Sequence, residues 1–214
     1  FDIRIKFIQP QYLADILTIL WVVGIINAII IIDIMNGLAT GISFIAAMTF
    51  LFIALPTEEI YVNLAAVSLA GGIFGFIKYN FPNAKIFMGD TGSMFLGFVL
   101  AALSLGTSYT KINDVALYSP ILILGIPIFD TFYVMYLRYR KGKSPFLGSK
   151  DHFALRLEAV GLTRKNVVIL IWLISVILSF AAFAISRVQL SVAIVIYILI
   201  FAVSLFGGWK LSKI

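Results

Sequence analysis

The chain has 214 residues, of which 62% are hydrophobic, and only 26 carry a formal charge (16 basic and 10 acidic). Soluble domains contain about 45–50% apolar and about 25% charged residues, so this composition indicates an integral membrane protein. The net charge of +6 comes from a few scattered basic residues, which argues against a nucleic-acid-binding surface. The absence of cysteine and the presence of a single histidine exclude disulfides, thiolate metal sites and multi-histidine sites.

Seven uncharged runs are candidates for membrane spans, each of which needs about 20 predominantly apolar residues. The runs are continuous and do not alternate between apolar and polar residues, which favours helices over a β-barrel. We therefore expect an all-α, polytopic membrane bundle with about seven transmembrane helices, forming one body over residues 1–214. Gly71, Gly72 and Gly75 share one run and predict a close contact with another helix. The runs are 16–32, 34–57, 60–77, 91–110, 115–129 (continuing past Asp130 to 137), 166–186 and 188–209.

The basic residues predict the orientation of this bundle. If the connection around Asp33 is cytoplasmic, loops at about 33–37, 78–92 and 138–165 and the C-terminal tail share its side. That side then holds 12 of the 16 basic residues. The positive-inside rule therefore predicts a chain that starts outside and ends inside a plasma (inner) membrane.

Unusual polar residues gather on the same predicted face. Carboxylates at a membrane boundary are costly, so their default interpretation is functional. The alternative is that each one is a helix cap or an interfacial charge. The residues concerned are Asp33 and Asn36 in IIDIMNGLATG, Asn80, Lys85 and Asp90 in YNFPNAKIFMGDTGS, Asp130 in GIPIFDTFYVMYLRYR, and Asp151, His152 and Arg156 in SPFLGSKDHFALRLEAVGL.

The segment GDTGS has the pattern of a magnesium–phosphate site. Gly89 and Gly92 flank Asp90, so the backbone can approach a ligand closely. Helix N-termini favour anions, and a carboxylate at such a point can hold Mg²⁺ together with water and phosphate oxygens. A capped helix N-terminus that binds no ligand has the same sequence pattern, and that alternative stays open.

The 138–165 loop carries eight basic residues, which fit either positive-inside anchoring or binding of a diphosphate. His152 alone is typical of a structural histidine. Its neighbours Asp151 and Arg156 make a polar functional role equally well supported.

Three segments together resemble one enzyme family. They are WVVGIINAIIIIDIMNGLATG, YNFPNAKIFMGDTGSMFLG and GIPIFDTFYVMYLRYRKGKSPFLGSKDHFALRLEAVGLT, in the order and spacing of the polyprenyl-phosphate N-acetylhexosamine-1-phosphate transferases. These glycosyltransferase family 4 enzymes start bacterial cell-envelope glycan synthesis. The likeness is closer to enzymes that use UDP-N-acetylglucosamine-type donors than to the UDP-muramoyl-pentapeptide branch.

The resemblance implies a reaction and its residues. A sugar-1-phosphate would move from a UDP-N-acetylhexosamine to a polyprenyl (undecaprenyl) phosphate, with release of UMP and a requirement for Mg²⁺. Asp33, Asp90 and His152 would be the catalytic residues, with Asp90 as the metal ligand. The substrate-binding residues would be Asn36, Lys85, Arg156, and Asn80 and Phe87, which would hold the uracil. The resemblance leaves room for a homodimer and implies no nucleic-acid partner.

Some positions depart from the family pattern. The family often has N-L-I-D-G-L-D-G where this chain has IIIDIMNG, and H-x-H-H where this chain has HFAL. The isoleucines and the lost histidines favour an alternative, a non-catalytic relative that binds UDP-sugar or lipid. A transporter or scaffold is a second alternative, but it predicts polar residues near the bilayer midplane.

The family also has an upstream Asp-Asp pair that this chain lacks, and the chain begins with Phe1. We therefore expect the chain to be the C-terminal two-thirds of a longer transferase and to be inactive alone.

Overall fold

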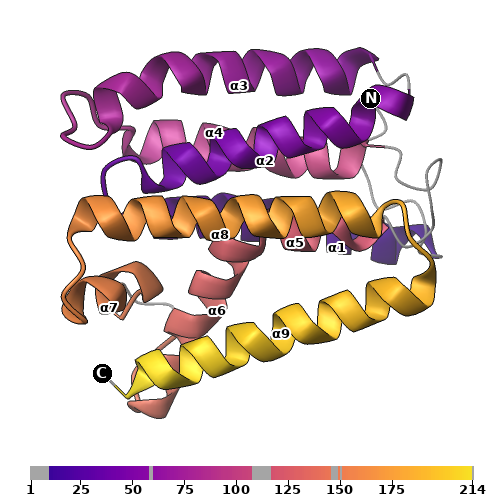
Figure 1. Ribbon diagram of the computed structural model, residues 1–214. Coiled ribbons are helices and arrows are strands. Elements are labelled where there is room, and N and C mark those ends of the chain that lie inside the picture. The colour runs from indigo at the N-terminus through magenta and orange to yellow at the C-terminus, as the bar shows by residue number, and fades with distance from the viewer. Residues whose placement is uncertain (1–9, 58–59, 108–116, 146–148, 150, 214) are drawn as a thin grey trace.

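The computed structural model describes the chain except residues 1–9, 58–59, 108–116, 146–148, 150 and 214. Parts of the expected runs 91–110 and 115–129 and of the 138–165 loop therefore lie outside the described residues. In the part described, every regular element is helical (Figure 1). The elements are α1 (Gln11–Ile32), α2 (Leu38–Ala54), η1 (Leu55–Thr57), α3 (Ile60–Asn80), α4 (Gly89–Gly106), α5 (Ser119–Ile123), α6 (Gly125–Arg140), α7 (Phe153–Ala159), α8 (Arg164–Ile185) and α9 (Leu190–Ser212).

Five of these helices are long and apolar enough to cross a membrane: α1, α3, α4, α8 and α9. A sixth, α2, is apolar but has 17 residues. A helix satisfies its backbone hydrogen bonds internally, which is the requirement for a segment surrounded by lipid. The predicted class, a polytopic all-α membrane bundle, is therefore confirmed.

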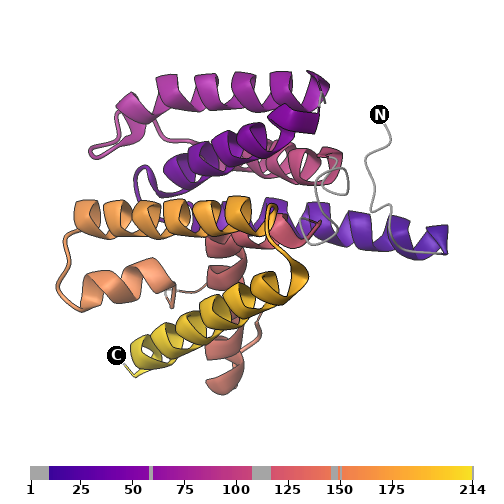
Figure 2. The ribbon, with the colours of Figure 1, turned by 45° about the vertical axis from the view of Figure 1, so that its right-hand side comes forward.

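The fifth expected span is not one helix. It is divided at Leu124 into α5, with five residues, and α6, with 16. Pro127 has no N–H to donate to the carbonyl of Ile123, and its ring clashes with that carbonyl in a regular helix, so the helix is interrupted just before it. The hydrogen-bond ladder resumes with the N–H of Ile128, which donates to the carbonyl of Leu124 at 3.1 Å. Figures 1 and 2 show α6 turning away from α8 and crossing its direction. Six of the seven expected segments thus form one continuous helix each, and five of these have spanning length.

The main core lies among α1, α2, α3, α4 and α8. α1 packs along α4, and α2 packs against both α3 and α8. The closest approach of α1 and α4 is at Gly97, because a side chain there would meet the Cα atom of Ile26 at 2.7 Å. The glycine contact predicted in α3 is wrong for the described part of the chain, since a Cβ atom at Gly71, Gly72 or Gly75 would meet nothing within 4 Å.

Two connections and the short helix α7 lie at the same end of the bundle. The α1–α2 and α3–α4 connections lie beside the start of α8, with α7 next to them, at the left of both ribbon views (Figures 1 and 2). The 33–37 and 78–92 loops and the α7 part of the 138–165 loop, which sequence analysis assigned to one face, are therefore neighbours in space (Figures 1 and 2).

Candidate functional site

The first part of the site is the turn between α1 and α2, from Asp33 to Gly37. Gly37 has φ +81°, a left-handed conformation that glycine adopts at no steric cost. A Cβ atom at Gly37 would also lie 2.6 Å from the Cβ atom of Phe81, on the α3–α4 connection. The turn is therefore packed directly onto that connection, and a larger residue would push the two apart.

Asn80, the last residue of α3, fastens the two connections together. Its side chain is buried, and its Oδ1 atom accepts hydrogen bonds from the Gly37 N–H (2.9 Å) and the Thr40 hydroxyl (2.7 Å). Its Nδ2 atom donates to the carbonyl of Ile86 at 3.1 Å. Nδ2 of Asn36 adds a bond of 3.3 Å to the carbonyl of Pro82. Both the oxygen and the nitrogen of the Asn80 amide are therefore hydrogen-bonded to the two connections, which gives Asn80 a positioning role.

A pocket of about 170 Å³ opens between these two connections. Four of the residues that the sequence singled out line it together: Asp33, Asn36, Asn80 and Phe87. Phe87 is 73% exposed, so one side of the pocket offers an aromatic surface on which a flat ring can stack. Ile34, Met35 and Met88 complete the lining. Lys85 is exposed on the same connection but does not line the pocket.

Asp90 lies beside this pocket, in the first turn of α4. Burial raises the pKa of the Asp33 carboxyl above its ordinary value of 3.8, and the neighbouring Asp90 carboxylate raises that pKa further. The two carboxylates therefore repel each other when both are ionised, and a cation bound between them would relieve this repulsion.

The pair fits one type of metal site. In the described part of the chain, no three His, Cys, Asp or Glu side chains gather into a metal-binding group. Mg²⁺ does not require such a cage, because it is usually held by one or two carboxylates together with waters and substrate phosphates. Asp33 and Asp90 meet that requirement, whereas they would be insufficient for a structural zinc site.

The loop before α7 is built around a buried pair, Asp130 and His152. Oδ2 of Asp130, on α6, lies 2.8 Å from Nδ1 of His152, and Oδ1 accepts the backbone N–H of Phe153 at 2.8 Å. Sequence analysis noted Asp130 but did not foresee this partner. The signal was an acid inside an otherwise apolar segment, where burial requires a hydrogen-bonded partner.

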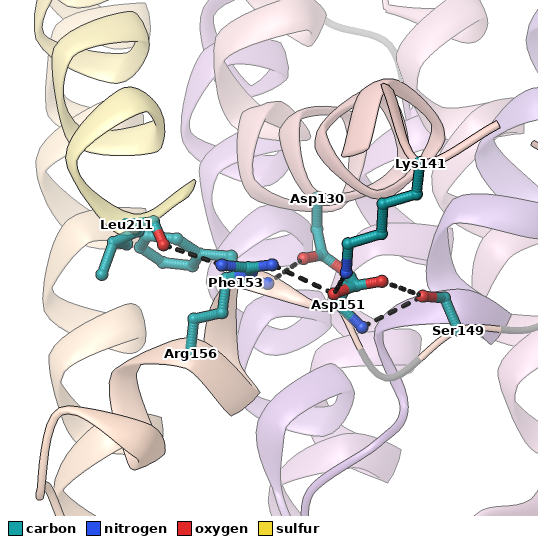
Figure 3. Close-up of polar contacts among 7 residues, drawn as sticks. All are labelled: Asp130, Lys141, Ser149, Asp151, Phe153, Arg156 and Leu211. Carbon is teal, nitrogen blue, oxygen red and sulfur yellow. Dashed lines mark hydrogen bonds and ion pairs between the residues drawn. The ribbon is translucent and has the colours of Figure 1, made fainter. Parts of the chain in front are cut away.

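Asp151 and Arg156 form a second polar cluster next to this pair (Figure 3). One carboxylate oxygen of Asp151 accepts from Lys141 Nζ (2.6 Å) and Arg156 Nη2 (3.0 Å), and the other accepts from the Ser149 hydroxyl (2.9 Å). The Lys141 hydrogen bond, helped by Ser149 and Arg156 and opposed by partial burial, lowers the pKa of Asp151 to about 2. Nη1 of Arg156 donates to the carbonyl of Leu211 at 2.8 Å, so the cluster also fixes the end of α9.

An apolar cluster joins the α7 loop to the pocket. It contains Ile32 and Met35 from the α1–α2 region, Ala154 from α7 and Val168 from α8. The pocket residues and His152 therefore belong to one end of the molecule but come from separate polar groups.

Comparison with known proteins agrees with this arrangement. The model of the family described as "Glycosyl transferase family 4" matches residues 3–108. A probable undecaprenyl-phosphate N-acetylglucosaminyl 1-phosphate transferase of Bacillus subtilis (strain 168) is 38% identical over 192 residues, which are 89% of this chain and 54% of that protein. The chain belongs to glycosyl transferase family 4. It spans about half the length of the curated relatives it matches.

Two further relatives differ in how much of the chain they match. A decaprenyl-phosphate N-acetylglucosaminephosphotransferase of Mycobacterium leprae (strain TN) is 35% identical over 82% of this chain and 49% of that protein. A phospho-N-acetylmuramoyl-pentapeptide-transferase of Lactobacillus johnsonii (strain CNCM I-12250 / La1 / NCC 533) is 38% identical over 49% of this chain and 34% of that protein. The pocket-lining residues Asp33, Asn36, Asn80 and Phe87, and Asp90 beside them, all lie inside the range that the family 4 model matches.

Proposed function

We propose that this protein transfers N-acetylhexosamine-1-phosphate from a UDP-sugar to a polyprenyl phosphate in the membrane, releasing UMP. The observation that carries the proposal is the pocket in which Asp33, Asn36, Asn80 and Phe87 meet, with Asp90 at its edge. Relatives named for N-acetylglucosamine and a polyprenyl phosphate match 89% and 82% of the chain at 38% and 35% identity, whereas a pentapeptide-transferase of Desulforudis audaxviator matches 76% of it at 33% identity, and this difference supports the N-acetylglucosamine donor class.

The pocket residues suit the nucleotide end of the donor. The exposed ring of Phe87 offers a stacking surface for uracil, and Asn36 offers hydrogen-bonding groups at the rim. The Asn80 amide holds both connections in place, and the Nδ2 hydrogen that is not bonded to Ile86 would donate to the base. The diphosphate of the donor would then lie toward Asp33 and Asp90.

The reaction brings two anionic substrates together. A phosphate oxygen of the lipid attacks the phosphorus that carries the sugar, the bond from that phosphorus to the bridging oxygen breaks, and UMP leaves. Asp33 and Asp90 would hold Mg²⁺, whose charge offsets the repulsion between the phosphates and the charge that develops on the leaving group. Lys85 and Arg156 are the basic residues proposed to attract the anionic substrates, although Arg156 is engaged with Asp151 and Leu211.

His152 is proposed to act next to this site. Its Nδ1 atom is occupied by Asp130, which would leave Nε2 as the nitrogen that faces a substrate. A histidine fixed in this way is oriented for proton transfer or for a hydrogen bond to a phosphate.

We further propose that the membrane is the plasma (inner) membrane and that the pocket faces the cytoplasm. The 12 basic residues on that predicted side support this orientation. UDP-sugars are soluble nucleotides, so a pocket at the membrane boundary suits their delivery from water.

A second candidate function is a relative that binds UDP-sugar without transferring it. Ile34, at a position where the family often has glycine, lines the pocket. Ala154 and Leu155, at positions where the family often has histidine, belong to the apolar cluster that joins α7 to the pocket. These positions therefore contribute packing in place of titratable groups.

The test uses membranes from cells that express the gene from its own locus, compared with membranes from a deletion strain. UDP-N-acetylglucosamine, polyprenyl phosphate and Mg²⁺ are added, and UMP and lipid-linked sugar are measured. The proposal predicts equimolar UMP and lipid diphosphate sugar that depend on the gene. Binding of UDP-sugar without gene-dependent UMP would establish the second candidate instead.

A further inference from the structure

Trp172, on α8, reaches the pocket region from a helix that contributes none of the pocket's lining residues. Its indole Nε1–H donates to the carbonyl of Gly37 at 3.2 Å. Gly37 also donates its N–H to Asn80, so the last residue of the Asp33 turn is held from both sides, by α3 and by α8. The position of this turn therefore depends on an indole 135 residues away in sequence.

The indole ring makes two further contacts at the same place. It lies 4.7 Å from the ring of Phe81, centroid to centroid, on the connection that leads to Phe87. It also covers Gly41 in α2, where a Cβ atom would overlap the indole atoms Cε2 and Nε1. Trp172 thus touches both connections that form the pocket and needs a glycine at position 41 to do so.

Trp172 also couples the pocket to the helix that follows the His152 loop. Val168 and Ile171, one turn or less from Trp172 on α8, are buried in the apolar cluster with Met35 and Ala154. A shift of α8 would therefore move the Gly37 carbonyl and the Phe81 ring together.

We infer that Trp172 is a positioning residue that sets the distance between the Asp33 turn and the Phe87 connection, and thereby the affinity for the nucleotide of the donor. This inference rests on the proposed function of the same pocket. It concerns affinity for the UDP-sugar and not the polyprenyl phosphate, because the hydrogen bond and ring contact of the indole are made with the two connections that form the pocket.

The first experiment measures UDP-N-acetylglucosamine binding by the purified chain in detergent with Mg²⁺. Trp172→Phe keeps an aromatic ring but removes the N–H donor to Gly37. Loss of one hydrogen bond should weaken binding about three- to tenfold. Trp209→Phe, at an exposed tryptophan on α9, is the matched control and should leave the Kd unchanged.

The second experiment uses Gly41. Gly41→Ala should weaken binding in the parental protein, because the added methyl group displaces the indole. The same change should reduce the binding affinity much less in a Trp172→Ala background, where the displaced ring is absent. Gly71→Ala, at a glycine with open space around it, should have no effect in either background.

A spectroscopic measurement separates positioning from a general loss of stability. The chain has three tryptophans. With Trp21→Phe and Trp209→Phe, the emission comes from Trp172 alone and should change saturably with UDP-N-acetylglucosamine, at the Kd found by direct binding. Free N-acetyltryptophanamide corrects for light absorbed by the nucleotide.

The outcomes are distinct. If the parental chain binds no UDP-sugar and membranes show no gene-dependent release of UMP, the proposed function fails. If the parental chain binds it, but Trp172→Phe binds equally well and the emission of Trp172 does not respond, the proposed function stands and the inference about Trp172 is overturned. In membranes with gene-dependent activity, Trp172→Phe should raise the KM for UDP-sugar and leave the KM for polyprenyl phosphate unchanged.

Discussion

Asp130 and His152 meet between α6 and the start of α7, where Oδ2 of Asp130 lies 2.8 Å from Nδ1 of His152. The same carboxylate accepts the N–H of Phe153, so it fixes both the imidazole and the first residue of α7. An ionised carboxylate only accepts hydrogen bonds, so with Asp130 in that form this contact would require a proton on Nδ1 of His152.

Replacement of Asp130 should therefore change the histidine more than the fold. In Asp130→Asn, the side-chain amide can still accept from Phe153 but can present its NH₂ group to Nδ1, which would move the imidazole proton to Nε2. Asp130→Ala removes both acceptors and should destabilise the protein by about 2 kcal/mol or more. ¹⁵N NMR of the chain labelled only at histidine reports the tautomer of His152 without ambiguity, because it is the only histidine. An unchanged tautomer in Asp130→Asn would show that this carboxylate does not orient the ring.

The lowered pKa of Asp151 predicts a specific loss of stability in acid. Its pKa is lowered from 3.8 to about 2 in the folded protein, chiefly by Lys141. A group with a lowered pKa contributes stability above its unfolded-state pKa, and that contribution is lost as the pH falls through the folded-state value. The parental Tm should therefore fall between about pH 4 and pH 2 more steeply than that of Asp151→Asn.

The matched control is Glu158→Gln, which breaks the more exposed ion pair with Arg164 and should leave the acid dependence nearly parental. Identical pH dependence in the parental protein and Asp151→Asn would mean that the cluster in Figure 3 does not form in solution.

Magnesium should stabilise the protein through Asp33 and Asp90. Two carboxylates that repel each other when ionised gain a common partner when the ion binds, and a ligand that binds only the folded state raises the Tm. Mg²⁺ at neutral pH should raise the parental Tm by a few degrees but should have little effect on Asp33→Asn or Asp90→Asn. Glu158→Gln serves again as a control. An equal Mg²⁺ effect in all four proteins would place the ion elsewhere.

The orientation can be tested with single cysteines, because the parental chain has none. Cysteines at Asn83 and Lys143 should react with an impermeant maleimide only from the cytoplasmic side. A cysteine at Gln189, exposed between α8 and α9, should react only from outside. Labelling of positions 83 and 189 from the same side would contradict the proposed topology.

Sequence reasoning succeeded where one segment carries its own signal. Long uncharged runs became helices, and the motifs around Asp33, Asn80 and Phe87 came together in one pocket because each follows or precedes such a helix. Sequence reasoning could not predict features that depend on a partner far away in the sequence. The close helix contact is at Gly97 and not at Gly71, since the partner helix decides which glycine is needed.

Three other features also depend on contacts or geometry that a single segment does not reveal. The fifth run is divided because Pro127 interrupts the helical hydrogen bonds. The uniformly apolar character of the run predicted a single helix and concealed this effect. Trp172 has no motif around it, because its role comes from a glycine on α2 and a carbonyl at the end of the α1–α2 turn. The amide of Asn80 is likewise engaged by the fold, which the sequence could not show.

The most direct measurement is the rate of lipid-linked sugar formation after Asp90→Asn is introduced at the chromosomal locus. Membranes with equal amounts of parental or variant protein receive radiolabelled UDP-N-acetylglucosamine, polyprenyl phosphate and Mg²⁺. Loss of a metal ligand removes several kcal/mol of transition-state stabilisation, and each 1.36 kcal/mol is about tenfold in rate, so the variant should be slower by about 10²-fold or more. A variant that forms the labelled lipid at the parental rate would contradict the assignment of this pocket as the site of transfer.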